Sequence, residues 1–256
     1  MARFVRVQGE NGPVYGRVEG EQIRLLSGDL LSGWNETDRC IPLEGTPLLA
    51  PCQPGKIMAV GFNYRDHAEE FHADLPTEPT VFLKAPTSLA APGQPVRYPK
   101  VMTAQVDYEA ELVIVIGRRA RHVPRAEALS HVFGYTVGND VTARDLQSPT
   151  GQWSLCKSFD TFAPIGPWIE TELNPAAGLE ISSRVNGQEK QRSNTRNLIF
   201  DVPFLVSYLS QVMTLEPGDL IFTGTPSGVG PVQPGDVMEM RIAGIGSLIN
   251  SVEREE

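Results

Sequence analysis

The chain has 256 residues, 41% of them hydrophobic, so it is long enough to build a packed core and too apolar to be disordered. It carries 31 acidic against 22 basic residues, and this net charge of −9 argues against a nucleic-acid partner, because phosphate binding needs a basic surface. No apolar signal segment and no run of 18 apolar residues is present, so no membrane span is expected, and three widely spaced cysteines fit a reducing cytoplasm better than a disulfide framework.

The first part of the chain is predicted to be a small β domain over residues 1–52. The segment ARFVRV alternates between apolar and other residues, Asn11-Gly12 is a strong turn signal, and the strand-like segments VYGRVEG and QIRLL follow. From Thr37 to Pro54 there are four prolines and no clear period. We therefore place a boundary near Pro51–Gly55 and expect one larger domain over residues 53–256.

The middle of the chain is predicted to contain short strands and few helices. Asn63 is placed to cap a short helix that runs through Glu70, and a second short helix is expected within residues 120–133. The predicted strands are Ile57–Gly61, VFLKAP (81–86), the apolar part of Val106–Gly117, and GYTVGND (134–140).

The last third combines a hairpin, one helix and two turn-to-strand segments. Asn186-Gly187 is a hairpin signal, and two copies of Pro-Gly-Asp each lead into a strand, LIFTG and VMEMRI. Asp201 is placed to cap a helix whose apolar positions share one face, which we assign to the core: Phe204, Leu205, Tyr208, Leu209, Val212 and Met213. The strands do not alternate regularly with helices, so the fold class predicted is a β-rich α+β fold.

The segment VDYEAELVIVIG, Val106–Gly117, begins with carboxylates although its second half is apolar. Side chains alternate along a strand, so Glu109 and Glu111 share one face. Like charges so close repel, and burying them is costly unless a cation compensates. A divalent metal is one interpretation; hydrated glutamates at a strand end are the other.

Asp140 in GNDVTARD strengthens the metal interpretation, because it lies at the polar end of another predicted strand. Two glutamates and an aspartate form a hard, all-oxygen ligand set suited to Mg²⁺, with Mn²⁺ or Ca²⁺ as alternatives. Three carboxylates would leave about three positions of an octahedral Mg²⁺ for water or a chelating substrate.

Several motifs in this order resemble the fumarylacetoacetate hydrolase family: E-x-E on a strand, N-D-x-x-A-R-D, K-S-F-D and T-G-T-P-x-G-V-G. The resemblance covers roughly Gly55 to Val252, and the amino-terminal segment resembles a small extra domain of many bacterial members. It implies a mixed β-sandwich roll, a divalent metal, usually a homodimer, and 2-oxo acid substrates. It also implies that Glu109, Glu111 and Asp140 are the metal ligands.

Further site residues follow from the same resemblance. It implies that His67 and Glu70, an i, i+3 pair in YRDHAEEF, form a dyad on a mobile lid that activates water; ordinary surface charges are the alternative. Lys157, in CKSFD, is implied as a catalytic cation. The resemblance implies that Lys84, Gln147 and Thr225 contact the substrate. Each residue also has a structural alternative: Lys84 could extend its ammonium group into water, Gln147 could be an ordinary surface residue, and TGTPSGVG around Thr225 could be a tight loop between strands.

The function these residues favour is Mg²⁺-dependent hydrolysis of a C–C bond in a 2,4-dioxo acid, as in an acylpyruvate. The alternatives are isomerisation or decarboxylation of a 2-hydroxyhepta-2,4-diene-1,7-dioate in aromatic-acid breakdown, and decarboxylation or tautomerisation of oxaloacetate. A non-catalytic metal-dependent binding protein is the alternative from another class, and it is disfavoured because a binder needs no general base.

Overall fold

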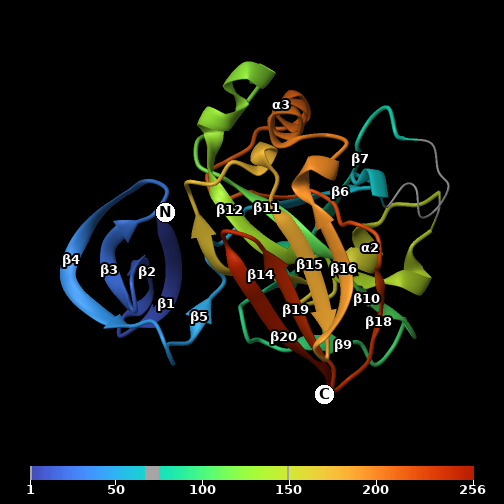
Figure 1. The fold of residues 1–256 in the computed structure, drawn as a ribbon, viewed down its shortest axis with the longest axis horizontal. Coiled ribbons are helices and arrows are strands. Elements are labelled where there is room, and N and C mark those ends of the chain that lie inside the picture. Colours follow the sequence, from blue (N-terminus) through green and yellow to red (C-terminus); the bar gives the residue numbers. More distant parts are fainter. Residues whose placement is uncertain (1, 67–74, 149) are drawn as a thin grey trace.

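A computed structural model describes residues 2–66, 75–148 and 150–256. A large sheet, two smaller sheets and a few short helices make up the described chain, so the predicted β-rich α+β fold is confirmed (Figure 1). None of the helices in the described part of the chain is both long and apolar enough to cross a membrane.

The large sheet runs from the amino-terminal strands to β7. Its order is β4 (Gly33–Pro42), β3 (Gln22–Asp29), β2 (Gly12–Glu19), β1 (Arg3–Gly9), β14 (Ala163–Glu170), β12 (Val132–Asn139), β11 (Ala110–Ile116), β17 (Leu220–Phe222), β6 (Ile57–Gly61) and β7 (Thr80–Lys84). Two short strands lie off this path: β5 (Leu48–Leu49) on β1 and β8 (Leu89–Ala90) on β14. The sheet is mixed, because β17 pairs parallel with β6 while β11 pairs antiparallel with β12.

Two smaller sheets complete the β structure. One has the order β16 (Gln188–Asn194), β15 (Glu180–Val185), β19 (Val237–Ile242), β20 (Gly246–Arg254) and β9 (Val96–Tyr98). The other has the order β13 (Thr142–Ala143), β10 (Val106–Tyr108) and β18 (Gly230–Val232). The hairpin predicted at Asn186-Gly187 is confirmed: it joins β15 to β16, and both residues have positive φ, 52° and 77°, as a tight two-residue turn requires.

The helices are short. Those that lie wholly within the described residues are α2 (Ser154–Lys157), α3 (Val202–Val212) and the 3₁₀ turns η1 (Pro86–Ser88), η2 (Arg125–His131), η3 (Arg144–Leu146), η4 (Pro175–Ala177) and η5 (Thr195–Asn197). Asp201 caps α3 as predicted, accepting a hydrogen bond from the amide of Phe204 at 2.9 Å. Leu205 and Leu209 are buried, but Val212, predicted to face the core, is exposed at the last helical residue. The second predicted helix is the 3₁₀ turn η2.

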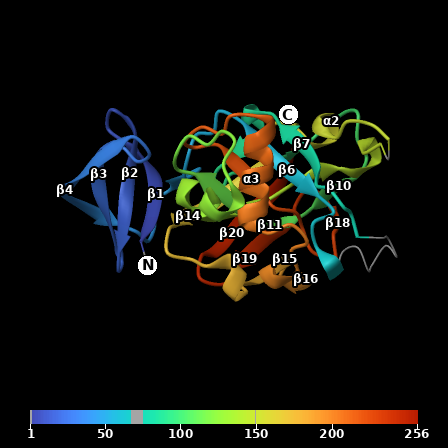
Figure 2. The same ribbon diagram turned by 90° about the horizontal axis from the view of Figure 1, so that it is seen from above.

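The first four strands form a lobe beside the main body (Figures 1 and 2). The lobe has a small core of Val5, Val7, Ile23 and Leu25. It is also continuous with the large sheet through β1, in which Phe4 lies opposite Ile169 of β14. The division into domains 1–52 and 53–256 stays a prediction.

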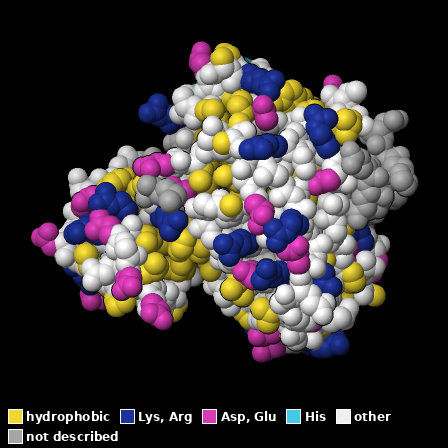
Figure 3. Space-filling model, in the orientation of Figure 1, with side chains coloured by type: hydrophobic (Ala, Val, Ile, Leu, Met, Phe, Trp, Pro, Cys, Tyr) yellow, Lys and Arg dark blue, Asp and Glu magenta, His cyan; other side chains and the backbone are white. Residues whose placement is uncertain are grey.

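The main core lies between the large sheet and the sheet that contains β15, β19 and β20. Leu112, Ile114 and Ile116 of β11 belong to it, while Val113 and Val115 on the opposite face pack in a second cluster with residues of β6 and β17. Strand β11 is therefore buried on both faces. The outer surface over β15 and β19 carries both signs of charge, with Arg184 and Arg241 beside Glu180 and Glu239 (Figure 3).

The segment Val106–Gly117 is not one continuous strand. It is interrupted at Glu109, where β10 ends and β11 begins and the sheet partners change. At this break the backbone amides hydrogen-bond to side chains from other strands. Asn139 Oδ1 accepts from Glu109 N at 2.9 Å, and Gln191 Oε1 accepts from Ala110 N at 3.1 Å. A strand pattern alone does not show such a break.

Candidate active site

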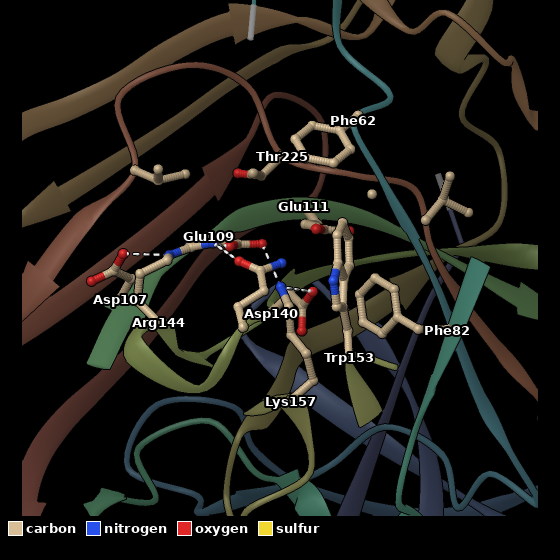
Figure 4. Close-up of a pocket in the computed structure, with 14 residues that line it drawn as sticks. Phe62, Phe82, Asp107, Glu109, Glu111, Asp140, Arg144, Trp153, Lys157 and Thr225 are labelled. Carbon is tan, nitrogen blue, oxygen red and sulfur yellow. Dashed lines mark hydrogen bonds and ion pairs between the residues drawn. The ribbon is translucent and has the colours of Figure 1, made fainter. Parts of the chain in front are cut away.

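A cavity of about 510 Å³ opens at this break (Figure 4). Its lining comes from β6, β7, β10, β11, η3, α2 and the loop after β17. The lining residues are Val60, Gly61, Phe62, Phe82, Asp107, Glu109, Glu111, Asp140, Arg144, Gln147, Trp153, Lys157, Thr225 and Val229.

Three buried carboxylates meet in the cavity. One oxygen of each of Glu109, Glu111 and Asp140, here called the carboxylate triad, lies within 4.8 Å of the others. Asp140 directly follows β12, the strand that pairs with β11, and its amide donates to the carbonyl of Glu109 at 2.9 Å. The pairing of β11 with β12 thus brings the carboxylates of the E-x-E motif close to Asp140 of the N-D motif.

Two cations surround Glu109. Lys157 Nζ donates to Glu109 Oε2 at 2.8 Å, and the guanidinium of Arg144 donates to Glu109 Oε1. Burial by itself would raise the pKa of Glu109, but Lys157 and Arg144 outweigh burial and lower the pKa to about 2. Glu109 is therefore an ionised carboxylate held in a fixed orientation.

Glu111 has a different environment. Its Oε2 accepts a hydrogen bond from the amide of Gly224 at 2.7 Å, and within the described residues no lysine or arginine forms an ion pair with it. Burial, followed by repulsion from Asp140 and Glu109, raises its pKa well above the usual range. Glu111 is thus the one carboxylate of the triad that has no ion-pair partner among the described residues.

Asp140 lies between two buried lysines. Lys157 Nζ donates to Asp140 Oδ2 at 2.6 Å, and Lys84 Nζ donates to Asp140 Oδ1 and to the carbonyl of Val141 at 3.3 Å. Burial lowers the pKa of Lys84, whereas Asp140 and Glu109 overcome burial and raise the pKa of Lys157. Lys84 is not among the lining residues, so the structure places this predicted substrate contact behind Asp140.

Arg144, which the sequence analysis does not single out, lies in the cavity wall. Its Nε donates to Asp107 Oδ2 at 2.7 Å, and its other nitrogens donate to Glu109 and to Gln147 Oε1. The predicted contact Gln147 is thereby fixed through its carbonyl oxygen, with its amide nitrogen left as the donor. Asp107 and Glu109 lie 37 and 35 residues before Arg144, so their contacts with Arg144 cannot be predicted from nearby sequence. The only sequence signal for a role of Arg144 was its place in the N-D-x-x-A-R-D motif.

Thr225 lies in the loop after β17. Its hydroxyl donates to the carbonyl of Ala110 at 3.0 Å and accepts from Gln191 Nε2 at 2.8 Å. In this arrangement the single proton of the hydroxyl is already donated to Ala110, so toward a ligand the hydroxyl could only accept a hydrogen bond. Gln191, also absent from the sequence-based site, holds both this loop and the amide of Ala110.

The opposite wall is aromatic. The rings of Phe62 and Phe82 lie 5.5 and 5.4 Å from the ring of Trp153, and these three residues are here called the aromatic wall (Figure 4). Lys157 Nζ lies 5.1 Å from the Phe82 ring centre, a cation–π distance that links the aromatic wall to the charged end.

The predicted dyad, His67 and Glu70, lies outside the described residues. Its roles therefore stay predictions. The neighbouring Asp66 is described, and it accepts hydrogen bonds from Ser193 and Asn197.

The carboxylate triad suits a hard divalent cation. Carboxylate oxygens are the ligands that Mg²⁺, Mn²⁺ and Ca²⁺ prefer, and the uncompensated charge of Glu111 is what a cation would balance. Within the described residues, four buried carboxylates (the triad and Asp107) face three cations at this point (Lys84, Arg144 and Lys157), which favours a metal over a purely structural charge cluster.

Family comparisons cover almost the whole chain. A family model described as fumarylacetoacetate (FAA) hydrolase C-terminal matches residues 56–253, and a second, described as Rv2993c-like, N-terminal, matches residues 2–51. Protein Rv2993c of Mycobacterium tuberculosis is 42% identical over 99% of this chain and 98% of its own length. Oxaloacetate tautomerase YisK of Bacillus subtilis is also 42% identical, over 78% of this chain and 70% of its own length.

Solved structures are similar over comparable lengths. A 5-carboxymethyl-2-hydroxymuconate delta-isomerase from Mycobacterium smegmatis has a TM-score of 0.92 and 42% identity, covering 99% of this chain and 100% of that one. A fumarylpyruvate hydrolase from Pseudomonas aeruginosa, in complex with Mn²⁺ and pyruvate, has a TM-score of 0.74 and 38% identity, covering 86% and 93%. The relatives' names thus span an isomerase, a hydrolase and a tautomerase.

Proposed function

The chain belongs to the fumarylacetoacetate hydrolase family, and from that premise we propose that it is a divalent-metal-dependent hydrolase that cleaves a C–C bond in a 2,4-dioxo acid, such as an acylpyruvate. One observation carries the proposal: the carboxylate triad is buried in a cavity, and one of its charges has no cationic partner among the described residues.

Glu109, Glu111 and Asp140 would hold Mg²⁺, with Mn²⁺ or Ca²⁺ as alternatives. When bound, such an ion polarises the 2-oxo acid and stabilises negative charge on its oxygens. Lys157 fixes Glu109 and Asp140 with two hydrogen bonds, and because an ammonium has three N–H donors, one remains for a substrate oxygen. Gln147 offers its amide nitrogen to the same cavity.

The reaction proposed is hydrolysis between C3 and C4 of the dioxo acid. His67, oriented by Glu70 as the family resemblance implies, would take a proton from water while the water oxygen attacks C4. The C3–C4 bond then breaks, its electron pair forms the enolate of pyruvate, and the C4 fragment leaves as a carboxylic acid. Lys157 donates to the oxygen that gains charge, and protonation at C3 yields pyruvate.

A second candidate is isomerisation or decarboxylation of a hydroxydiene dioate. The observation that favours it is the similarity to the Mycobacterium smegmatis isomerase, which extends over both the amino-terminal lobe and the main body. Oxaloacetate decarboxylation or tautomerisation would use the same cavity and is supported by the similarity to the Bacillus subtilis tautomerase.

A substrate panel tests these candidates. Metal-free protein and protein with millimolar Mg²⁺ are assayed with acetylpyruvate, a 2-hydroxyhepta-2,4-diene-1,7-dioate and oxaloacetate. We expect Mg²⁺-dependent loss of diketo absorbance with acetylpyruvate, with slower conversion of the other two. Conversion of the hydroxydiene dioate without any cleavage of acetylpyruvate would contradict the hydrolase proposal and support the second candidate.

The dyad is tested separately with His67→Ala. Removing a general base typically lowers the rate by a factor of about 10² to 10⁴. Because His67 is not assigned as a metal ligand, its removal should leave the affinity for the metal unchanged. We therefore expect most acetylpyruvate cleavage to be lost while calorimetry still detects Mg²⁺ and oxalate binding. His72→Ala, in the same segment, is the control. Wild-type turnover by His67→Ala contradicts the assignment of the base.

A further inference from the structure

A second cavity, of about 290 Å³, lies where α3 meets η2, β12, η4 and η5, at the end of the main body that carries α3 in Figure 1. It is here called the second cavity. Its described lining shares no residue with the cavity of the carboxylate triad. The lining residues used below are Leu129, Tyr135, Leu173, Leu198 and Val202. A ligand bound between them would therefore lie outside the proposed active site.

The walls of the second cavity are mainly apolar. Leu198 and Val202 belong to the main core and are 8% and 3% exposed, and Leu173 packs against the same core. Leu129 lines the cavity as well but is 53% exposed, so the cavity has a side that opens to solvent. An apolar cavity of about 150 Å³ can hold benzene. A volume of about 290 Å³ therefore has room for an aromatic ring with a small substituent.

The hydroxyl of Tyr135 is a buried polar group that faces this apolar space without a partner. Tyr135 is 4% exposed, and its hydroxyl forms no hydrogen bond with any described residue. It is also not one of the fully enclosed oxygens and nitrogens that lack a partner in the described chain, so it is reached from the cavity; those atoms are Tyr64 Oη, Thr136 Oγ1, Trp168 Nε1 and Ser183 Oγ. Buried tyrosine hydroxyls usually find a partner.

The hydrogen-bonding character of the second cavity is that of a single donor. Burial raises the pKa of Tyr135 to about 12, so the hydroxyl keeps its proton at neutral pH. Two other polar side chains of the lining are engaged: Thr195 Oγ1 donates to the carbonyl of Pro175 at 2.7 Å, and Asp201 Oδ2 accepts from Arg125 at 2.7 Å. The described lining contains no lysine or arginine, so it offers no cation to an anionic ligand.

We infer that the second cavity is a binding site for an uncharged, mainly apolar molecule that carries a carbonyl group. The apolar body lies against Leu173, Leu198 and Val202, and the carbonyl oxygen accepts a hydrogen bond from Tyr135. This ligand differs in charge from the 2-oxo acids of the proposed reaction. The inference uses no residue of the carboxylate triad, so it stands or falls independently of the proposed hydrolysis.

Acetophenone, an uncharged aromatic ketone, is the probe for the location of the site. It is titrated into the full chain labelled at leucine and valine methyl groups, and the methyl signals are followed by NMR. We expect saturable shifts at Leu173, Leu198 and Val202, whether or not Val60 and Val229 in the cavity of the carboxylate triad also respond. Shifts confined to Val60 and Val229, or no shift at millimolar concentration, overturn the inference.

α-Methylstyrene is the matched probe for the hydrogen bond, because a CH₂ group replaces the carbonyl oxygen of acetophenone. Wild type should bind acetophenone roughly threefold to tenfold more tightly than α-methylstyrene, the range that one neutral hydrogen bond contributes. Equal affinity of wild type for both probes means that the Tyr135 hydroxyl serves only water, and it overturns the assigned class of ligand.

Tyr135→Phe removes the donor and should abolish the preference for acetophenone while leaving the affinity for α-methylstyrene unchanged. Tyr208→Phe, on α3 but outside the described lining, is the control and should keep the preference. The methyl spectrum without probe shows whether each variant keeps the fold. A folded Tyr135→Phe variant that still prefers acetophenone as wild type does overturns the role of Tyr135 and with it the inference.

Discussion

Glu111 differs from the other two members of the carboxylate triad in having only a backbone donor, the amide of Gly224. Glu109 and Asp140 each have two cationic partners in the described chain. The E-x-E motif thus contains two different glutamates. Glu109 is paired with cations of the protein itself, whereas Glu111 would need a bound metal ion to balance its charge. Sequence alternation alone does not distinguish the two residues.

Replacing Glu111 with glutamine should weaken Mg²⁺ binding and remove the thermal stabilisation that Mg²⁺ provides. For wild type, a ligand at about 100 times its Kd contributes ~2.7 kcal/mol, on the order of 5–10 °C in Tm for a chain of this length. Glu111→Gln should show little of this shift, and its metal-free Tm should equal or exceed that of wild type, because an unfavourable buried charge has been removed.

Differential scanning calorimetry of chelator-treated protein across a Mg²⁺ titration measures this effect. Glu10→Gln, at an exposed glutamate in the amino-terminal lobe, is the matched control and should keep the full shift. A wild-type Tm that does not change up to millimolar Mg²⁺ contradicts the metal site itself.

The break between β10 and β11 is the element on which the cavity depends. It turns Glu109 and Glu111 toward Asp140, and it is maintained by amide side chains from β12 and β16, 30 and 81 residues away in sequence. The strands on either side could be predicted, since their apolar patterns are local. The break could not, because the side chains of Asn139 and Gln191 that satisfy its backbone become neighbours only after the sheets form.

Gln191 should therefore affect both stability and metal affinity. Gln191→Leu keeps a similar volume but leaves the buried amide of Ala110 without its acceptor, at a cost of roughly 1–3 kcal/mol in the free energy of unfolding. It also releases Thr225, so the loop after β17 loses a fixed contact. We expect a lower denaturation midpoint together with weaker Mg²⁺ binding by calorimetry.

Gln188→Leu, on the same hairpin but exposed, is the control and should change neither quantity. If Gln191→Leu lowers stability but leaves the Kd for Mg²⁺ unchanged, the break does not depend on Gln191 for the geometry of the carboxylate triad.

Over the whole molecule, the motifs identified the family and its β-rich fold, because E-x-E, N-D-x-x-A-R-D and K-S-F-D stand close to the strands and turns that carry them. The aromatic wall was not predicted. Phe62, Phe82 and Trp153 come from three separate segments, and single aromatic residues in a sequence are indistinguishable from ordinary core residues until the fold brings them together.

Assembly into a homodimer is expected from the family and is supported by the exposed apolar surface near the cavity. Strand β7 ends the order of the described large sheet, and its Leu83 is 44% exposed; α2, which packs next to β7, exposes 63% of Leu155. Open sheet edges and exposed apolar side chains are usually covered in stable proteins. Sedimentation at micromolar concentration should therefore give about twice the 28.0 kDa of the chain.

Leu155→Glu places a charge on this surface and should shift the sedimentation equilibrium toward the monomer, because burying an unpaired carboxylate in an interface is unfavourable. Val212→Glu, at a residue that is also 63% exposed but lies on α3, is the matched control and should leave the mass unchanged. Wild-type protein that sediments only as a 28.0 kDa species contradicts the dimer, and a dimer that both variants weaken equally contradicts its location beside β7.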